Sequence, residues 1–251
     1  MFRPALDVNN GLGKPSLVRV LTAISSLEHA DAFVNSRIRS DGTFNCYLGE
    51  EIVIDNTVWQ VVGVDTELDK GDIALTQHHI TLIPKTIIGT SSIHSSNSNC
   101  NGYANSDTMY TKTIPDIVTH LDSVLGDHLL ERRVKLTNAT SSGTSPRGYM
   151  ASGNGYYSVR ANLMCQMQVY GTVNSSFGNA YDTGDDTEQL PGFATNKVDK
   201  ASNSWYWLRD VYGSVSGTSA YYFSNVYIDG SLSTNNVGSS GGGVRPLITI
   251  G

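Results

Sequence analysis

The last third of the chain carries three apolar segments, Trp205-Tyr206-Trp207-Leu208-Arg209, Ala220-Tyr221-Tyr222-Phe223-Ser224-Asn225-Val226-Tyr227-Ile228 and Val244-Arg245-Pro246-Leu247-Ile248-Thr249-Ile250. They are separated by stretches rich in glycine and serine, and Asp229-Gly230 directly follows the second segment. Short runs of aromatic and β-branched residues between turn-forming residues are typical of β-strands. The sequence therefore predicts a strand at each of the three segments.

Residues 51–64 contain two similar apolar runs, separated by Asp55-Asn56, a pair that favours the turn of a two-residue β-hairpin. Further strands are expected at residues 73–75 and 80–83. Thr113, Pro115 and Gly126 mark the two ends of a helix over residues 114–125, where apolar residues recur at helical spacing. Short strands, long polar loops and short helices together predict an α+β fold with a small twisted antiparallel sheet.

The N-terminal region has a different pattern. Residues 1–15 are rich in Pro, Gly and Asn and are expected to form an extended arm, whereas apolar residues from Leu17 to Val34 recur every three or four positions after Ser16. A helix with this stripe packs either on its own domain or on another chain, and both interpretations remain open. We therefore divide the chain into a docking or oligomerisation element, residues 1–43, and a main domain, residues 44–251.

Composition excludes several classes of protein. The chain has 251 residues, only 16% of them charged, and a net charge of −6 without any basic run, so we expect no nucleic-acid partner. No apolar run reaches the ~18 residues that a membrane-spanning helix needs, so we expect no membrane insertion. The N-terminus lacks the apolar segment of a secretory signal, which predicts synthesis in a cytoplasm. The three cysteines form no CxxC pair and are expected to be free thiols.

Catalytic and metal-binding motifs are absent from the sequence. The six histidines form no HExxH or zinc pattern, and no GxSxG elbow presents a serine nucleophile, so we predict a protein that is not an enzyme. The weak metal candidates are Asp182, Asp185 and Asp186, whose oxygens suit a hard cation such as calcium. A solvated acidic loop is the preferred interpretation, and no cofactor is expected.

Tyrosine, serine and asparagine alternate across the last predicted strands in a composition typical of binding surfaces. Tyrosine offers a large contact area at a small cost in rotamer entropy, and its ring stacks on sugar rings. The alternative is that these rings simply cover the sheet, because tyrosine is a good strand former. The candidate ligand-binding residues are Tyr206, Tyr212, Tyr221, Tyr222, Asn225 and Tyr227.

Several motifs carry a resemblance to a known family. Trp207-Leu208-Arg209 is followed about 35 residues later by Gly243-Val244-Arg245-Pro246, and the run Val58-Trp59-Gln60-Val61-Val62 stands near the start of the main domain. Together with Gly102-Tyr103-Ala104-Asn105-Ser106-Asp107 and the helix over residues 114–125, these motifs resemble the C-type-lectin-like domain of phage fibre, receptor-binding and bacterial surface proteins, over about residues 44–251. The resemblance implies a scaffold formed by Trp59, Trp207, Leu208 and the last strand, with the first and last strands of the domain paired near its base.

The same resemblance implies a function. The chain would be a bacteriophage virion protein, a tail or head fibre or a decoration protein, assembled in the host cytoplasm and exposed on the particle exterior. It would display its lectin-like domain to a host-surface glycan or protein, form a homotrimer, and contact other virion proteins through residues 1–40. A purely structural capsid or tail protein without its own receptor is the alternative.

Arg209 and Arg245 stand beside residues expected to be buried. A buried guanidinium needs a carboxylate or carbonyl oxygens around it, because an unpaired buried charge is costly. We therefore predict that both arginines pair internally and stabilise the fold, with contact to a ligand as the alternative.

Overall fold

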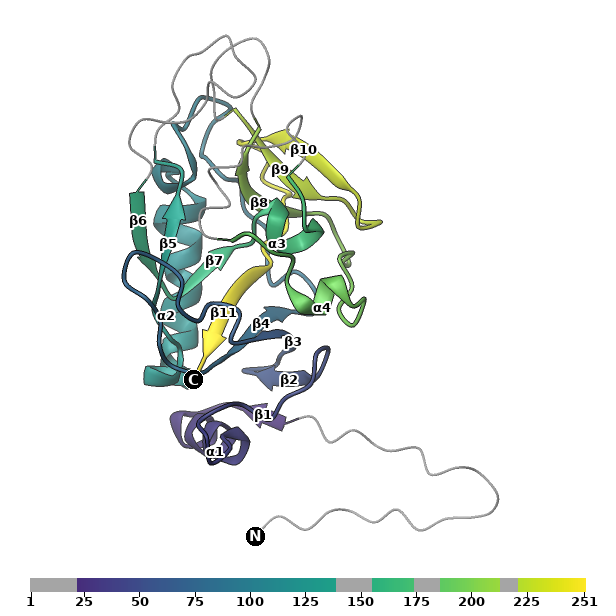
Figure 1. Cartoon of the computed structure of the whole chain (residues 1–251). Coiled ribbons are helices and arrows are strands. Elements are labelled where there is room, and N and C mark those ends of the chain that lie inside the picture. The colour runs from purple at the N-terminus through teal and green to yellow at the C-terminus, as the bar shows by residue number, and fades with distance from the viewer. Residues whose placement is uncertain (1–21, 139–154, 174–185, 213–220) are drawn as a thin grey trace, which may run out of the picture.

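The computed structural model describes residues 22–138, 155–173, 186–212 and 221–251, and all structural statements below concern these residues. They form a mixed α+β fold built on a six-stranded sheet with the order β1-β2-β3-β4-β11-β7 (Figure 1). Its strands are β1 (Thr22–Ile24), β2 (Glu51–Ile54), β3 (Thr57–Val64), β4 (Ile80–Pro84), β7 (Ala161–Leu163) and β11 (Pro246–Ile250). The α+β prediction is confirmed at this level.

The first half of this sheet follows the sequence pattern closely. Strands β2 and β3 form the predicted hairpin, and Asp55 and Asn56 at its turn both have positive φ, 42° and 64°. Both values match the turn type that suits the twist of two paired strands. Strand β1 pairs with β2 in parallel, and β4 pairs with β3 in the antiparallel sense. Residues 73–75, by contrast, form no strand, and only Leu75 makes an isolated bridge, to Leu68.

The C-terminal strand β11 lies inside the sheet, between β4 and β7, and every one of its residues is buried. The resemblance implied that the first and last strands of the domain pair with each other. Instead, β3 and β4 separate β2 from β11 in the strand order. Strand β11 is thus hydrogen-bonded along both edges, and both of its faces are covered. A strand in such a position is typically apolar along its whole length.

The helix over residues 114–125 is confirmed as α2 (Ile114–Leu125), with Pro115 in its first turn and Gly126 after its end. Thr113 occupies the N-cap position but makes no side-chain capping bond there, because a π-helical turn (Met109–Thr113) precedes it. Two shorter helices follow, α3 (Gln166–Tyr170) and α4 (Pro191–Ala194). No helix among the described residues is long and apolar enough to cross a membrane.

The N-terminal region differs from the prediction. Residues 22–24 form strand β1 instead of helix, and helix α1 (Leu27–Arg37) begins at Ser26, whose side chain accepts from the His29 amide. Ala30, Phe33 and Val34 of α1 are buried in the same core as the sheet. The proposed boundary at residue 43 therefore separates no second core among the described residues; residues 1–21 lie outside them.

The six-stranded sheet separates two cores because alternate side chains of a strand point to opposite faces. Trp59 and Val61 of β3 and Ile248 of β11 join the larger core, with α1 and α2. Val62 of β3 and Leu247 of β11 join the smaller core, with residues of α3 and α4.

A three-stranded sheet adjoins this smaller core, in the order β10-β9-β8. Its strands are β8 (Tyr206–Val211), β9 (Tyr222–Val226) and β10 (Leu232–Asn236). A two-stranded sheet of β5 (Arg132–Leu136) and β6 (Gly155–Val159) completes the fold.

The two motif segments lie side by side. The Trp207 amide donates to the Gly243 carbonyl at 3.0 Å, and the Gly243 amide donates to the Trp205 carbonyl at 3.0 Å. The Trp207 indole lies so close to Gly242 that a Cβ there would meet Nε1 at 1.9 Å. Gly242 is thus required by the close contact of the two segments.

Candidate binding site

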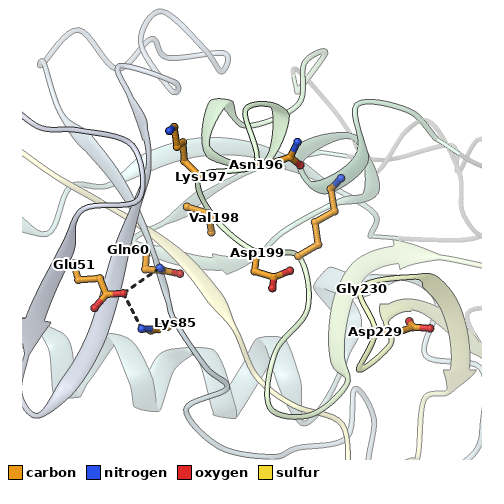
Figure 2. Close-up of a pocket in the computed structure, with 10 residues that line it drawn as sticks. Glu51, Gln60, Lys85, Asn196, Lys197, Val198, Asp199, Asp229 and Gly230 are labelled. Carbon is orange, nitrogen blue, oxygen red and sulfur yellow. Dashed lines mark hydrogen bonds and ion pairs between the residues drawn. The ribbon is translucent and has the colours of Figure 1, made fainter.

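A wide polar groove of about 550 Å³ lies where the large sheet meets the α4 loop and the turn after β9. Figure 2 shows Glu51, Gln60 and Lys85 on one side and Asp229 on the other, with the segment from Asn196 to Asp199 between them. The lining residues are Glu51, Gln60, Lys85, Asn196, Lys197, Val198, Asp199, Lys200, Asp229 and Gly230. Most of these side chains are polar or charged, so the groove suits a polar ligand.

Arg245 holds two walls of this groove together. Its Nε donates to the Pro84 carbonyl at 2.8 Å and its Nη2 to the Lys85 carbonyl at 3.3 Å, on the side of the large sheet. Its Nη1 donates to the Asp199 and Lys200 carbonyls at 3.1 and 3.2 Å, on the opposite wall. Since Arg245 is fully buried, its predicted internal pairing with carbonyl oxygens is confirmed.

Two tyrosines fix the remaining lining segments. The Arg245 guanidinium lies over the Tyr206 ring, with its Cζ 5.1 Å from the ring centroid. The Tyr206 hydroxyl donates to the Lys200 carbonyl at 2.8 Å. The Tyr170 hydroxyl donates to the Gly230 carbonyl at 2.9 Å, and its ring contacts the Lys200 ammonium. Burial raises the pKa of both tyrosines, so both hydroxyls stay protonated donors at neutral pH.

Backbone contact also holds one lining segment of the groove against the large sheet's first hairpin region. The turn before β2 approaches the 196–200 loop at Gly49, which has a φ of +79°. A Cβ on Gly49 would lie 2.6 Å from the Lys197 carbonyl oxygen. Only glycine fits both the conformation and the approach.

The charges of the groove are arranged as donors and acceptors and not as an acid–base pair. Lys85 donates to Glu51 at 2.8 Å, and Gln60 also donates to Glu51, at 3.4 Å (Figure 2). Asp199 accepts from the Ala201 amide at 2.9 Å. Hydrogen bonds from Ser231 lower the pKa of Asp229, so this carboxylate stays ionised and accepts protons poorly at neutral pH. The arrangement can bind a ligand through many hydrogen bonds.

Arg209 lies fully buried away from the groove, in a network of charges. Its Nη2 donates to Asp186 at 2.6 Å and its Nη1 to the Leu163 carbonyl at 2.9 Å, which confirms the predicted internal pairing. The second Asp186 oxygen accepts from Lys70 at 3.3 Å. Both carboxylate oxygens of Asp186 therefore face cations, and the preferred prediction of a solvated position is wrong for this residue, which is 4% exposed.

The other metal candidates, Asp182 and Asp185, lie outside the described residues. Within the part of the chain that the structure describes, no group of three or more His, Cys, Asp or Glu side chains could hold a metal ion. The three cysteines are free thiols, as predicted.

The predicted tyrosine surface is divided by the structure. Tyr227, 51% exposed, stands next to the groove residues Asp229 and Gly230, whereas Tyr221 and Tyr222, 41% and 42% exposed, lie at the other end of β9. The five residue steps from Tyr222 to Tyr227 span roughly 16 Å of extended chain. Tyr212 is half-buried and its ring makes an edge contact with Tyr222.

Two of the six candidate ligand-binding residues are not at the surface. Tyr206 and Asn225 are 0% and 2% exposed and so do not reach a ligand at the surface. Tyr206 lies in β8, every residue of which is buried, and Asn225 lies in the buried part of β9, where only Tyr222 is exposed. Tyr206 instead positions the groove loop from below.

Sequence reasoning did not find the groove. The sequence places Glu51 at the start of a predicted strand, and it assigns no function to Lys85 or to residues 196–200. The available signal was the run Asn196-Lys197-Val198-Asp199-Lys200, a local concentration of charge in a chain with only 16% charged residues. Comparisons with protein-family models, with curated proteins and with solved structures give no match to this chain.

Proposed function

We propose that the chain is a non-enzymatic bacteriophage virion protein, a tail or head fibre or decoration protein, that recognises a host-surface glycan through the polar groove. The observation that carries the proposal is the groove itself, in which lysine, carboxylate and amide side chains line one open surface. Sugar hydroxyls both donate and accept hydrogen bonds, so a mixture of donors and acceptors suits them. The exposed ring of Tyr227 at the edge can stack on a sugar face.

The C-type-lectin-like character of the domain is part of this proposal. It is supported by the direct pairing of the Trp207 and Gly243 segments and by Arg245, which connects the second motif to the groove. The position of β11 between β4 and β7 differs from what the resemblance implied.

The test uses the full chain on an array of purified bacterial surface polysaccharides, followed by interferometry on each bound species. We expect Lys197→Ala and Lys85→Ala each to weaken binding about tenfold, since each removes a hydrogen bond to the ligand. Lys112→Ala is the matched control, because Lys112 is exposed and lies outside the groove. An equal loss of binding affinity in all three variants would show that only net charge matters, and would contradict the groove as the binding site.

Two other outcomes also discriminate. Loss of binding in Tyr221→Ala or Tyr222→Ala, with the lysine variants unaffected, would move the contact to the other end of β9. Binding to no polysaccharide, together with unstable particles when the protein is missing, would favour the structural decoration protein over the receptor-binding one.

We propose that the N-terminal region, residues 1–40, attaches the protein to the particle and forms the trimer contact. Within residues 22–40, the side chains of Leu27 and Ile38 are 51% and 43% exposed, an apolar surface that a partner can cover. Deleting residues 1–40 would also remove Ile24, Phe33 and Val34 from the core. The clean test is therefore Leu27→Glu with Ile38→Glu, with mass measured by light scattering. We expect the full chain to be trimeric and the variant monomeric but folded; an unchanged mass would contradict this docking surface.

A further inference from the structure

His128 stands in the short 3₁₀ turn Gly126–His128, where α1, the end of α2 and the end of β11 meet (Figure 1). Helix α1 packs on this turn so closely that a Cβ on Gly126 would lie 2.8 Å from Leu27 Cδ2. From the other side, the Gly251 amide donates to the His128 carbonyl at 3.1 Å, directly after β11. The turn therefore lies between the first helix and the last strand of the described chain.

Each ring nitrogen of His128 faces an oxygen that can only accept a hydrogen bond. Nδ1 lies 2.8 Å from the Gly251 oxygen, and Nε2 lies 2.7 Å from Oδ1 of the Asp31 carboxylate, in α1. A neutral imidazole has one donor nitrogen and one acceptor nitrogen, whereas an imidazolium donates from both. Only the imidazolium satisfies both contacts, because in the neutral ring one nitrogen lone pair would face an oxygen lone pair.

His79 shows the opposite arrangement. Its Nε2 accepts from the Glu67 amide at 3.0 Å, and its Nδ1 donates to the Gln77 carbonyl at 2.9 Å, so a neutral ring satisfies both contacts. Burial lowers the pKa of His79, which agrees with the neutral form. Among the described residues, four histidines have a partner at one ring nitrogen only: His29, His78, His94 and His120. Of the six histidines, all of them described, His128 alone has an acceptor at both nitrogens.

The neighbouring charges are engaged elsewhere. Arg160 donates to the carbonyls on either side of His128, those of Gly126 and Leu129, at 2.7 and 2.9 Å. Its charge is balanced by Asp122, which lies 2.7 Å from Nη1. Three further titratable side chains of α1 and of the turn are exposed: Glu28, His29 and Asp127. On the far side of Gly251, His78 pairs with Asp65 at 2.8 Å. Asp31 is thus the carboxylate that faces the His128 ring.

We propose that His128 forms a proton-dependent clasp, which holds α1 against the C-terminal end of β11. With the proton bound, one ring connects the Asp31 carboxylate to the Gly251 oxygen. Loss of the proton leaves one of the two contacts without its hydrogen, so one end of the clasp opens. Histidine side chains ordinarily change charge between about pH 5 and 8. Helix α1 is therefore held more firmly at the acid end of that range than at the alkaline end. The clasp does not depend on the proposed glycan function.

Ring ¹⁵N spectra of the full-length protein report the protonation directly, because imidazolium and the two neutral tautomers give different patterns of ¹⁵N shifts. We expect His128 to be mostly imidazolium at pH 7, where an exposed histidine is mostly neutral, and His79 to be neutral there. His128→Gln assigns the signals. If that variant does not fold, Asp31→Asn assigns them instead, since this side chain is 68% exposed. A neutral His128 ring at pH 7 would overturn the proposal.

Hydrogen exchange of the α1 amides measures the consequence for the helix. After correction for the intrinsic exchange rate, we expect their protection to fall about tenfold from pH 6 to pH 8.5, the size of one hydrogen bond to a charged group. Asp31→Asn supplies an amide donor to Nε2, so the neutral ring then satisfies both contacts and the pH dependence should disappear. Glu28→Gln, an exposed carboxylate on the same helix, is the matched control and should keep it. Protection of α1 that does not change with pH in the wild type, or an equal pH dependence in both variants, would also overturn the proposal.

Discussion

Arg209 and Arg245 are both fully buried, yet their surroundings differ in kind. Arg209 pairs with a carboxylate, that of Asp186. Arg245 makes no ion pair with any described residue, and its hydrogen bonds go to four carbonyls and one hydroxyl. A carboxylate partner balances charge, whereas carbonyl partners tie together the backbone segments that own them. We infer that Arg209 stabilises the fold in a pH-dependent way, and that Arg245 shapes the polar groove.

The Arg209 side of this comparison is a network of buried charges. Burial by itself would raise the pKa of Asp186, but the charges of Arg209, Lys70 and Arg132 outweigh it and hold the pKa below its usual value. Burial raises the pKa of Glu67, which Arg132 only partly opposes from 3.2 Å. The pKa of each carboxyl in this network therefore depends on the charges of the other groups.

The largest expected effect is that of Arg209→Met. Removing the cation leaves Asp186 buried without its closest partner, which costs about 3–5 kcal/mol of unfolding free energy. Urea unfolding at pH 7 measures it, with Arg39→Met, at an exposed position, as the control expected within about 0.5 kcal/mol of wild type. If Arg209→Met does not fold, Arg209→Lys keeps the charge and provides the measurement. A cost equal to that of the control would contradict the network.

The next effect is that of Arg245→Met, which leaves carbonyls on both walls of the groove without their donor. We expect about 2–3 kcal/mol of lost stability, because several backbone acceptors become unsatisfied. We also expect faster hydrogen exchange at residues 197–201 and loss of polysaccharide binding. Arg209→Lys is the matched variant, in which stability falls but binding remains. Equal loss of binding in both variants would break the comparison between the two arginines.

The sequence predicted the frame much better than the site. Turn residues and periodicity located the hairpin at Asp55-Asn56 and the helix from Ile114, since both signals are local. Residues 22–24 were misjudged because their pairing partner, β2, lies about 30 residues away, and helical spacing in a short apolar run does not exclude a strand.

The groove was missed for the same physical reason. Its lining residues come from five separate segments, and hydrogen bonds of Arg245 and Tyr206 join only some of them in three dimensions. The sequence did predict that Arg245 needs internal acceptors, because the cost of burying a charge is independent of the fold. It did not identify those acceptors, which are backbone carbonyls and carry no signature in the sequence.

A third prediction sharpens the pH difference. Burial raises the pKa of Asp210 to about 7. The unfolded chain releases this proton near the ordinary value of 3.8, so it binds fewer protons than the folded chain between those values. The free energy of unfolding therefore falls as the pH rises from about 4 to 7. Asp210→Asn removes this fall, so the variant should gain about 1–3 kcal/mol over wild type at pH 8 relative to pH 4.

Urea unfolding between pH 4 and 8 measures this profile. Asp41→Asn is the control, because hydrogen bonds from Thr43 lower the pKa of Asp41 and its titration lies below that window. We expect Asp41→Asn to shift the profile by a constant amount. Arg245→Met should likewise lose the same stability at pH 5 and at pH 8, because no carboxylate faces Arg245 among the described residues. A profile unchanged by Asp210→Asn would contradict the pH dependence of the Arg209 side.

The smallest expected effect is that of Tyr206→Phe, and it separates the two ways in which Arg245 can hold the groove. The Tyr206 hydroxyl donates to the Lys200 carbonyl at 2.8 Å and accepts from Arg245 at 3.3 Å. Phenylalanine keeps the ring under the guanidinium and leaves the four carbonyl bonds of Arg245 intact, so we expect a loss of about 1 kcal/mol. Tyr222→Phe, at an exposed ring, is the matched control and should change stability by less than about 0.5 kcal/mol. If Tyr206→Phe costs as much as Arg245→Met, the arginine acts on the 196–200 loop through the tyrosine and not through the carbonyls directly. If it costs no more than Tyr222→Phe, the carbonyl bonds of Arg245 alone hold the two walls together.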